Sequence, residues 1–276
     1  MDQLALASER IERAVLADLH AAAPATTRKI LGLRLETIGT ALVSIARNDP
    51  TILLNRTIGL GVEGRASWET VEAIVARYAD EGIKEYFIHL HPKAEPPQLR
   101  DWLTQAGLVR GRGWMKFHRE PTPPPALSSE LRVQRIGTEQ AVDFGRIAAS
   151  AFDLSETAVP MIASLADRPG WRLYMSFADD IPTGTGALFI QDGVAWFDWG
   201  ATLPPYRQRG GQAVVLCQRI RDAIALGCRL LVTTTGEAVE GDPQHSYKNI
   251  LRTGFRPGYL RENFVPASST ANTFGR

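Results

Sequence analysis

The stretch that decides the fold is Tyr206-Arg207-Gln208-Arg209-Gly210-Gly211-Gln212-Ala213-Val214-Val215-Leu216. It follows the apolar run 194–203, which is typical of a buried strand, and it opens an amphipathic helix. Adjacent glycines let the backbone approach a ligand closely, and the first N–H groups of a helix have no partner within it and carry positive potential. Together with the charges of Arg207 and Arg209, this order of strand, loop and helix predicts a site for a phosphate or pyrophosphate.

This stretch resembles motif A of the GNAT superfamily of acetyl-CoA-dependent N-acyltransferases, whose usual form is R/Q-x-x-G-x-G/A. The register that starts at Arg207 ends on Gln212, which departs from the pattern, whereas the register Gln208-x-x-Gly211-x-Ala213 satisfies it. A strand is predicted over 229–234, and Arg252-Thr253-Gly254-Phe255 resembles the K/R-x-G-F that follows the fourth helix of the superfamily. The alternative is an ordinary βαβ unit with a basic glycine loop.

The resemblance implies that the chain binds acetyl-CoA as a co-substrate. The backbone of Ala201, Thr202 and Leu203 would pair with the pantetheine arm, and one N–H group would face the thioester oxygen. The pyrophosphate would lie on the loop residues Arg207, Gln208, Arg209, Gly210, Gly211, Gln212 and Ala213.

The implied reaction is direct attack of an amine on the thioester, with expulsion of a thiolate that an acid can protonate. The usual general acid of the family is a tyrosine on the fourth helix, but the corresponding position here is Ile250. Tyr247 lies about one helical turn earlier, on nearly the same face, and is the first substitute. Ser246 and Asn249 follow it, and we include both among the cofactor contacts. A tyrosine that only packs or caps a surface is the alternative.

Two carboxylates are candidates for the base that takes a proton from the amine. Asp198 lies on the central strand and Glu237 lies just past the next strand, and we rank them almost equally. Strict alternation along the strand predicts that Asp198 and Thr202 share one face. Solvated or paired structural acids are the alternative for both.

Composition narrows the class of protein. The chain has 276 residues, 44% hydrophobic and 22% charged, which is ordinary for a globular protein. A net charge of +1 argues against a dedicated nucleic-acid or membrane surface, and the two cysteines fit reduced thiols in a cytoplasmic protein. His89 and His91 share a strand face without a supporting Cys, Asp or Glu cluster, so we predict no metal.

The Pro-rich segment 121–130 is the clearest boundary, because such a sequence does not continue a helix or a central strand. On either side the pattern repeats: Gly82 and Gly107 end helices in the first half, as Gly227 and Gly254 do in the second. The spacings between the stops are similar, so we predict an α/β (α+β) fold of two GNAT-like mixed-sheet units in tandem. The predicted units are residues 1–120 and 131–276.

Only the second unit has the residues for a cofactor site. The segment 62–67, which corresponds to the glycine loop, lacks its first arginine and carries Glu63, so the first unit is predicted to be degenerate. Gly59, Gly61 and Gly64 spell G-x-G-x-x-G, but no ribose-binding acid follows at the end of the next strand, so turn glycines are favoured over a nicotinamide site.

The sequence therefore predicts an N-acetyltransferase that uses acetyl-CoA and acts on a small-molecule or peptide amine. The alternative is a catalytically inactive acyl-CoA-binding or regulatory module.

Overall fold

The computed structural model describes residues 1–269. In the N-terminal half the elements are α1 (Gln3–Ala22), α2 (Ala25–Leu31), β1 (Leu33–Ile38), β2 (Ala41–Ala46), β3 (Arg56–Ile58), α3 (Trp68–Asp80), β4 (Phe87–Leu90), α4 (Leu99–Gln105) and β5 (Leu108–Arg119). In the C-terminal half they are β6 (Arg132–Ile136), α5 (Ala141–Ala151), α6 (Val159–Ala163), β7 (Trp171–Ala178), β8 (Ile181–Gln191), β9 (Val194–Thr202), α7 (Gly211–Ala225), β10 (Leu230–Gly236), α8 (His245–Arg252) and β11 (Arg256–Pro266). Apart from β6 and short 3-10 turns, the two halves have the same order of helices and strands. The predicted duplication of a mixed α/β unit is confirmed.

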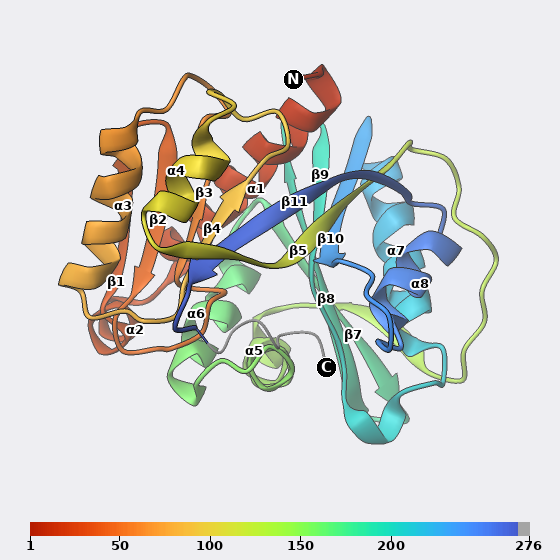
Figure 1. Cartoon of the computed structure of the whole chain (residues 1–276). Helices are drawn as coiled ribbons and strands as arrows, with labels where there is room; N and C mark the ends of the chain where they lie inside the picture. Colours follow the sequence, from red (N-terminus) through yellow and green to blue (C-terminus); the bar gives the residue numbers. More distant parts are fainter. Residues whose placement is uncertain (270–276) are drawn as a thin grey trace.

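The described strands form one 11-stranded mixed sheet, in the order β1-β2-β3-β4-β11-β5-β10-β9-β8-β7-β6. The last strand of each half lies inside the sheet of the other half. β5 pairs with β10, and β11 pairs with both β4 and β5. Figure 1 shows β5 and β11 side by side, crossing between α3 at one end of the molecule and α7 and α8 at the other. The two halves are therefore joined by an exchange of strands.

The glycine stops that indicated the repeat are confirmed. Gly82 and Gly227 have φ values of 69° and 76°, and Gly107 and Gly254 have values of 86° and 88°. This left-handed conformation ends a helix without the strain that a side chain would add.

The first helix begins earlier than the sequence indicated. The apolar spacing of Ile11, Val15 and Leu19 predicts a helix over 8–23 with Ser8 as its cap. In the structure α1 starts at Gln3, and Asp2 accepts a hydrogen bond from the N–H of Ala5 at 2.8 Å. Ser8 lies inside the helix and donates to the carbonyl of Leu4. The composition of residues 29–45 predicts extended structure from Lys29, but α2 continues to Leu31 and the first strand starts at Leu33.

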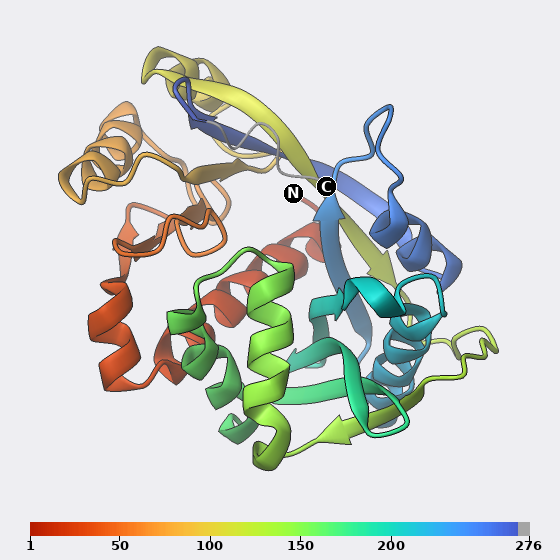
Figure 2. The same cartoon turned by 90° about the horizontal axis from the view of Figure 1, so that it is seen from below.

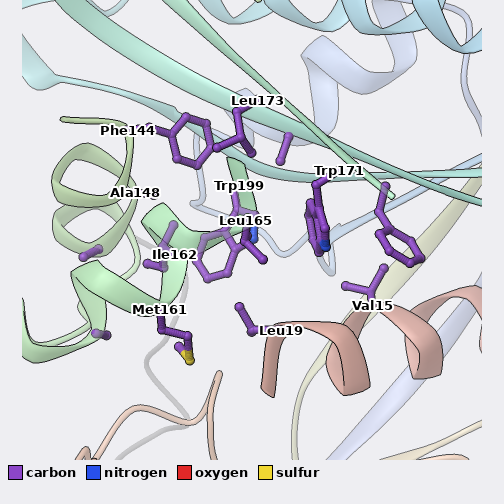
Figure 3. Close-up of a cluster of buried hydrophobic side chains, with 14 of the residues drawn as sticks. Val15, Leu19, Phe144, Ala148, Met161, Ile162, Leu165, Trp171, Leu173 and Trp199 are labelled. Atoms are coloured by element: carbon purple, nitrogen blue, oxygen red, sulfur yellow. The ribbon is translucent and has the colours of Figure 1, made fainter. Parts of the chain in front are cut away.

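One hydrophobic core is shared by both halves. Figure 2 shows α1 next to α5 and α6, and Figure 3 shows Leu19 of α1 and Ile162 of α6 directed into the same cluster as Trp199 of β9. Separate clusters lie under α3 and α4 in the first half and under α7 and α8 in the second. The face of β9 that meets α1 is here called the shared-core face, and the opposite face the α7 face.

The Pro-rich segment 121–130 contains no helix or strand and runs beside α7, where the carbonyl of Pro125 accepts a hydrogen bond from Cys217 Sγ at 3.8 Å. The division of the chain into units at this segment stays a prediction. None of the helices within residues 1–269 is both long and apolar enough to cross a membrane.

Candidate functional site

The strands β9 and β10 part toward their C-terminal ends. Their parallel pairing runs from Leu230 opposite Val194 to Thr233 opposite Phe197 and then stops. β9 continues to Thr202, whereas the end of β10 pairs with β5 instead. The carboxyl ends of two neighbouring strands thus open next to the loop that the sequence singled out.

A β-bulge in β9 lies at this opening. The pairing with β8 skips from Ala201 opposite Thr185 to Asp198 opposite Ala187, and Trp199 has a φ value of 51°. Arg219 of α7 binds the backbone at the bulge: its Nη1 donates to the carbonyl of Ala187 at 2.9 Å and to the carbonyl of Asp198 at 3.0 Å. Burial lowers the pKa of Arg219 to about 10.

The bulge reverses the expected arrangement of side chains. Trp199 and Ala201 both lie in the shared core, and Asp198 accepts a hydrogen bond from Trp196 Nε1 in that same core. Thr202 lies on the α7 face, where its Oγ1 is 3.3 Å from Oε1 of Gln212. The expectation that Asp198 and Thr202 share a face is wrong, because a bulge adds one residue to the alternation.

The backbone of Thr202 faces the opening. Leu203 N donates to Thr183 O of the β8 side at 2.8 Å, so alternation turns the N–H and C=O of Thr202 away from β8. Ala201 pairs with Thr185, and the carbonyl of Leu203 accepts from Tyr206 N. Of the residues Ala201, Thr202 and Leu203, Thr202 is therefore the one whose backbone N–H and C=O are directed into the opening between the strands.

The loop after β9 presents backbone donors. Gln208 and Gly210 have φ values of 64° and 77°, and α7 begins at Gly211 without a side-chain cap. Ala213 and Val214 donate to Gly210 O, but within residues 1–269 no acceptor meets the N–H groups of Gly211 and Gln212. Unpaired N–H groups at the start of a helix of this length produce a positive potential that favours an anion.

The two arginines of the loop, Arg207 and Arg209, are exposed and make few contacts with the rest of the chain. Arg207 Nε donates to Thr202 O at 3.3 Å, and Arg209 pairs with the exposed Glu130 at 3.2 Å and lies over the Tyr206 ring. Ser129 Oγ donates to Arg209 O at 2.7 Å, which ties the end of the Pro-rich segment to the loop. Both guanidinium groups have nitrogens left for an anion.

The two carboxylates proposed as the base have different surroundings. Glu237 accepts from Arg110 Nη2 at 3.1 and 3.0 Å and from the backbone N–H of Gly113 at 3.0 Å. Asp198 accepts from Trp196 Nε1 at 3.0 Å and from Trp199 N at 2.8 Å, and no cation pairs with it directly in the described residues. Asp198 also lies at the bulge, whereas Glu237 is tied to the β5 surface.

Tyr247, the substitute acid, lies on the α7 face. Its ring packs edge-on against Phe117 at 4.9 Å between centroids, within the cluster under α7 and α8. Ile250 is buried in the same cluster, Ser246 is exposed and Asn249 is half-buried. Tyr247 and Asp198 thus lie on opposite faces of the sheet.

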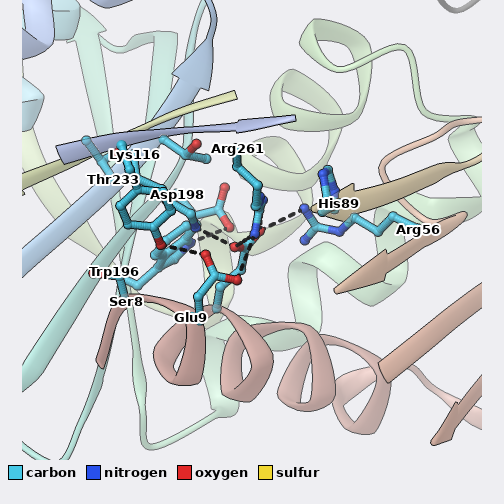
Figure 4. A network of polar contacts seen from close by, with 12 residues as sticks. Ser8, Glu9, Arg56, His89, Lys116, Trp196, Asp198, Thr233 and Arg261 are labelled. Atoms are coloured by element: carbon cyan, nitrogen blue, oxygen red, sulfur yellow. Dashed lines mark hydrogen bonds and ion pairs between the residues drawn. The ribbon is translucent and has the colours of Figure 1, made fainter. Parts of the chain in front are cut away.

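A buried charge network on the shared-core face was not found from the sequence (Figure 4). Glu12 of α1 is completely buried and pairs with Lys116 of β5, Arg261 of β11 and Arg56 of β3. Burial by itself raises the pKa of Glu12, but Arg261 and Lys116 outweigh it and hold the pKa well below its usual range. Burial lowers the pKa of Lys116 to about 8, against the opposing effect of Glu12.

The G-x-G-x-x-G sequence forms closed turns. Gly59 and Gly61 have φ values of 79° and 69°, and a Cβ at Gly61 would lie 2.5 Å from Glu95 O. Glu95 N donates to Gly61 O and Ser67 caps α3. The glycines therefore serve a tight turn, as the sequence favoured.

A cavity of about 870 Å³ lies at the other end of β9, between the first half of α1 and the starts of β9 and β10. Val194, Leu230 and His118 are among its lining residues. None of the site residues expected from the sequence lines it, so this cavity is separate from the opening at the bulge.

Neither a protein-family model nor a curated protein sequence matches the chain. Solved structures do match it. A GCN5-related N-acetyltransferase from Kribbella flavida superposes with a TM-score of 0.65 at 18% identity, over 95% of this chain and 96% of that one. A GCN5-related N-acetyltransferase from Sphaerobacter thermophilus superposes with a TM-score of 0.57 at 15% identity, over 82% of this chain and 76% of that one. A tandem GNAT protein from the clavulanic acid biosynthesis pathway superposes with a TM-score of 0.53 at 16% identity, over 76% of this chain and 73% of that one. At these identities the likeness concerns the fold, and the chain has the tandem fold of the GNAT N-acetyltransferases.

Proposed function

We propose that the chain is an acetyl-CoA-dependent N-acetyltransferase whose active site lies in the C-terminal half. The observation that carries the proposal is the opening between β9 and β10 at the bulge, directly beside a helix N-terminus with unpaired N–H groups. A GNAT fold with this geometry supports the binding of an extended thioester with a pyrophosphate at one end.

The residues present fit acetyl-CoA. Gly211 and Gln212 would donate their N–H groups to the pyrophosphate, and Arg207 and Arg209 would add charge from the exposed side of the loop. The remaining loop residues Gln208, Gly210 and Ala213 would set the conformation of the loop backbone around those N–H groups. Thr202 would pair with the pantetheine arm, since its backbone groups point into the opening.

The geometry also suggests how the transfer would proceed. Acetyl-CoA supplies an activated carbonyl. Asp198, on the shared-core face, would take the proton of the attacking amine directly or through a water, because no direct ion pair with a cation holds it within the described residues. Tyr247, on the other face, is the proposed donor to the leaving sulfur. A thioester bound in the opening between β9 and β10 would have Asp198 toward one face of the sheet and Tyr247 toward the other, so each could exchange a proton with a different group of the substrate.

The acceptor is proposed to be a primary amine of a small molecule or peptide. The N-terminal half is proposed to lack a cofactor site of its own, because Ser67 caps α3 and Glu63 pairs with Arg10 where an anion would have to bind. One molecule of acetyl-CoA would therefore bind per chain.

Thermal unfolding with acetyl-CoA tests the proposal. A ligand present at about 100 times its Kd stabilises the folded state by about 2.7 kcal/mol, which raises the Tm visibly. We expect this rise in the parent chain and its loss in Arg207→Ala/Arg209→Ala. Arg221→Ala, an exposed arginine further along α7, is the matched control and should keep the rise.

A screen of amines for release of free CoA completes the test. Thiol release with an amine supports the transferase. A rise in Tm without thiol release from any amine would favour the inactive acyl-CoA-binding module, and no rise in Tm at all would reject both readings.

A further inference from the structure

Part of the buried charge network belongs to the N-terminal half but meets the site of the C-terminal half. Glu12 comes from α1 and Lys116 from β5, and both are completely buried. β5 enters the sheet next to β10, where Lys116 lies opposite Thr234. The strand exchange thus places a lysine of one half beside β10 of the other.

A continuous path of contacts connects Glu12 to Asp198 (Figure 4). Lys116 pairs with Glu12, and its Nζ lies 4.1 Å from the centroid of the Trp196 ring. Trp196 Nε1 donates to Asp198 Oδ2 at 3.0 Å, and the N–H of Trp199 donates to Oδ1 at 2.8 Å. The carboxylate is therefore held by two donors, and one of them belongs to a ring that carries a cation on its face.

Lys116 is not needed to satisfy Glu12. Arg261 donates to both oxygens of Glu12, at 2.5 and 2.9 Å, and Arg56 donates to one of them at 3.3 Å. Arg261 also pairs with Glu9. Without Lys116 the two arginines and the two glutamates still balance in charge. While it pairs with Glu12, Lys116 also places its charge over the Trp196 ring, and a cation on the ring face makes the indole N–H a stronger donor.

We propose that Lys116 is a positioning residue for the proposed acyl transfer, holding the Asp198 carboxylate in place through Trp196. The inference rests on the proposed function, since it takes Asp198 as the base. The N-terminal half then contributes to the chemistry of the site, although it binds no acetyl-CoA itself.

Kinetics of variants in the full chain test the proposal. Lys116→Met should lower kcat roughly tenfold, a fraction of the roughly 10²–10⁴-fold contribution of a base. It should leave the KM for acetyl-CoA unchanged, and Lys116→Arg should restore most of kcat. Because Lys116 acts through Asp198, Lys116→Met should cause no further loss in an Asp198→Asn background. An equal loss in both backgrounds would overturn the proposal.

Trp196→Phe tests the same path without changing Lys116. It keeps an aromatic ring near Lys116 and removes the N–H donor together with part of the indole, so its loss in kcat should be at least that of Lys116→Met and the two should not add. This variant remains informative if Lys116→Met does not fold. A kcat equal to that of the parent would contradict the path.

A readout that needs no turnover separates this inference from the proposed function. In the ¹⁵N-tryptophan-labelled chain, Trp196→Phe identifies the Trp196 indole resonance. Asp198→Asn should move that resonance upfield, and Lys116→Met should move it in the same direction, whereas the exposed Lys248→Met should not. An indole resonance unmoved in Lys116→Met overturns the inference even if the chain releases CoA. A moved resonance in a chain that acetylates no amine upholds the link and rejects the transferase.

Discussion

At the level of single residues, the proposed chemistry depends on which carboxylate can accept a proton. Asp198→Asn should lower kcat by roughly 10²–10⁴-fold, because it removes the proposed base and leaves the backbone site intact. Glu237→Gln should lower kcat far less and should weaken folding instead, since it breaks the contacts with Arg110 and Gly113. Steady-state kinetics and circular dichroism of the two variants separate these effects. The reverse ranking would make Glu237 the base.

A second prediction at this scale concerns acid stability. Burial lowers the pKa of His20 to about 4, and His20 Nε2 lies 2.8 Å from Ser44 Oγ. In the unfolded chain His20 binds a proton near pH 6.5, whereas in the folded chain it binds one only near pH 4. The free energy of unfolding therefore falls as the pH drops from about 6.5 to about 4. At about 1.4 kcal/mol per unit, this single group accounts for up to about 3 kcal/mol.

Urea unfolding at pH 7 and pH 4.5 measures this effect. His20→Gln keeps a donor toward Ser44 and should lose about 2 kcal/mol less than the parent between these pH values. His245→Gln, at an exposed position of α8, should behave as the parent does. Equal acid sensitivity of parent and His20→Gln would mean that other groups control it.

The residues of the glycine loop could be predicted from the sequence, but those of the buried charge network could not. Arg207, Arg209 and the glycines stand in one short stretch with a known pattern, so local reading found them. The partners of the buried network are far apart in sequence, since the residue numbers of Glu12 and Lys116 differ by 104 and those of Glu12 and Arg261 by 249. Each is an ordinary charged residue in its own helix or strand, and only the tertiary fold brings them together.

At the level of elements, the contact between β8 and α7 fixes the position of the glycine loop. Gly186 of β8 lies opposite the bulge, and a Cβ there would lie 2.7 Å from the guanidinium carbon of Arg219 and 2.8 Å from Val215 Cγ1. Gly186→Ala should push α7 outward, destabilise the fold by about 1–3 kcal/mol and weaken acetyl-CoA binding.

Urea unfolding and a thermal shift with acetyl-CoA measure both consequences. Gly137→Ala is the control, because its Cβ would meet only the end of the Glu139 side chain, which can move. If Gly186→Ala kept the stability and the affinity of the parent, then α7 would tolerate a shift and the loop would not depend on this contact.

The bulge also marks the limit of element prediction from sequence. The run 194–203 indicates a buried strand, and that strand is confirmed as β9, which ends at Thr202. Nothing in an uninterrupted apolar run shows where a bulge interrupts the alternation of side chains. The prediction that Asp198 and Thr202 share a face was therefore wrong. Gly200 was the one local signal, since a glycine within a strand often accompanies a bulge.

At the level of the whole molecule, the exchange of β5 and β11 makes the halves interdependent. The spacing between the glycines that end the helices predicted the repeat, because each of these positions needs a positive φ that glycine adopts without strain. The exchange itself could not be predicted, since the two strands follow equivalent helices and each fits the same place in either sheet. The shared core under α1, α5 and α6 adds a second link between the halves.

We therefore expect the chain to unfold as one cooperative unit. Residues 131–276 alone would lack α1, leaving the shared core open, and would lack β4 and β5, the two strands with which β11 pairs. Urea transitions followed by tryptophan fluorescence and by circular dichroism should coincide for the full chain. The fragment 131–276 should be unfolded or aggregated, and its coexpression with residues 1–130 should restore a soluble complex. Two separate transitions, or a fragment that folds alone and binds acetyl-CoA, would show that the exchanged strands connect the halves without stabilising them.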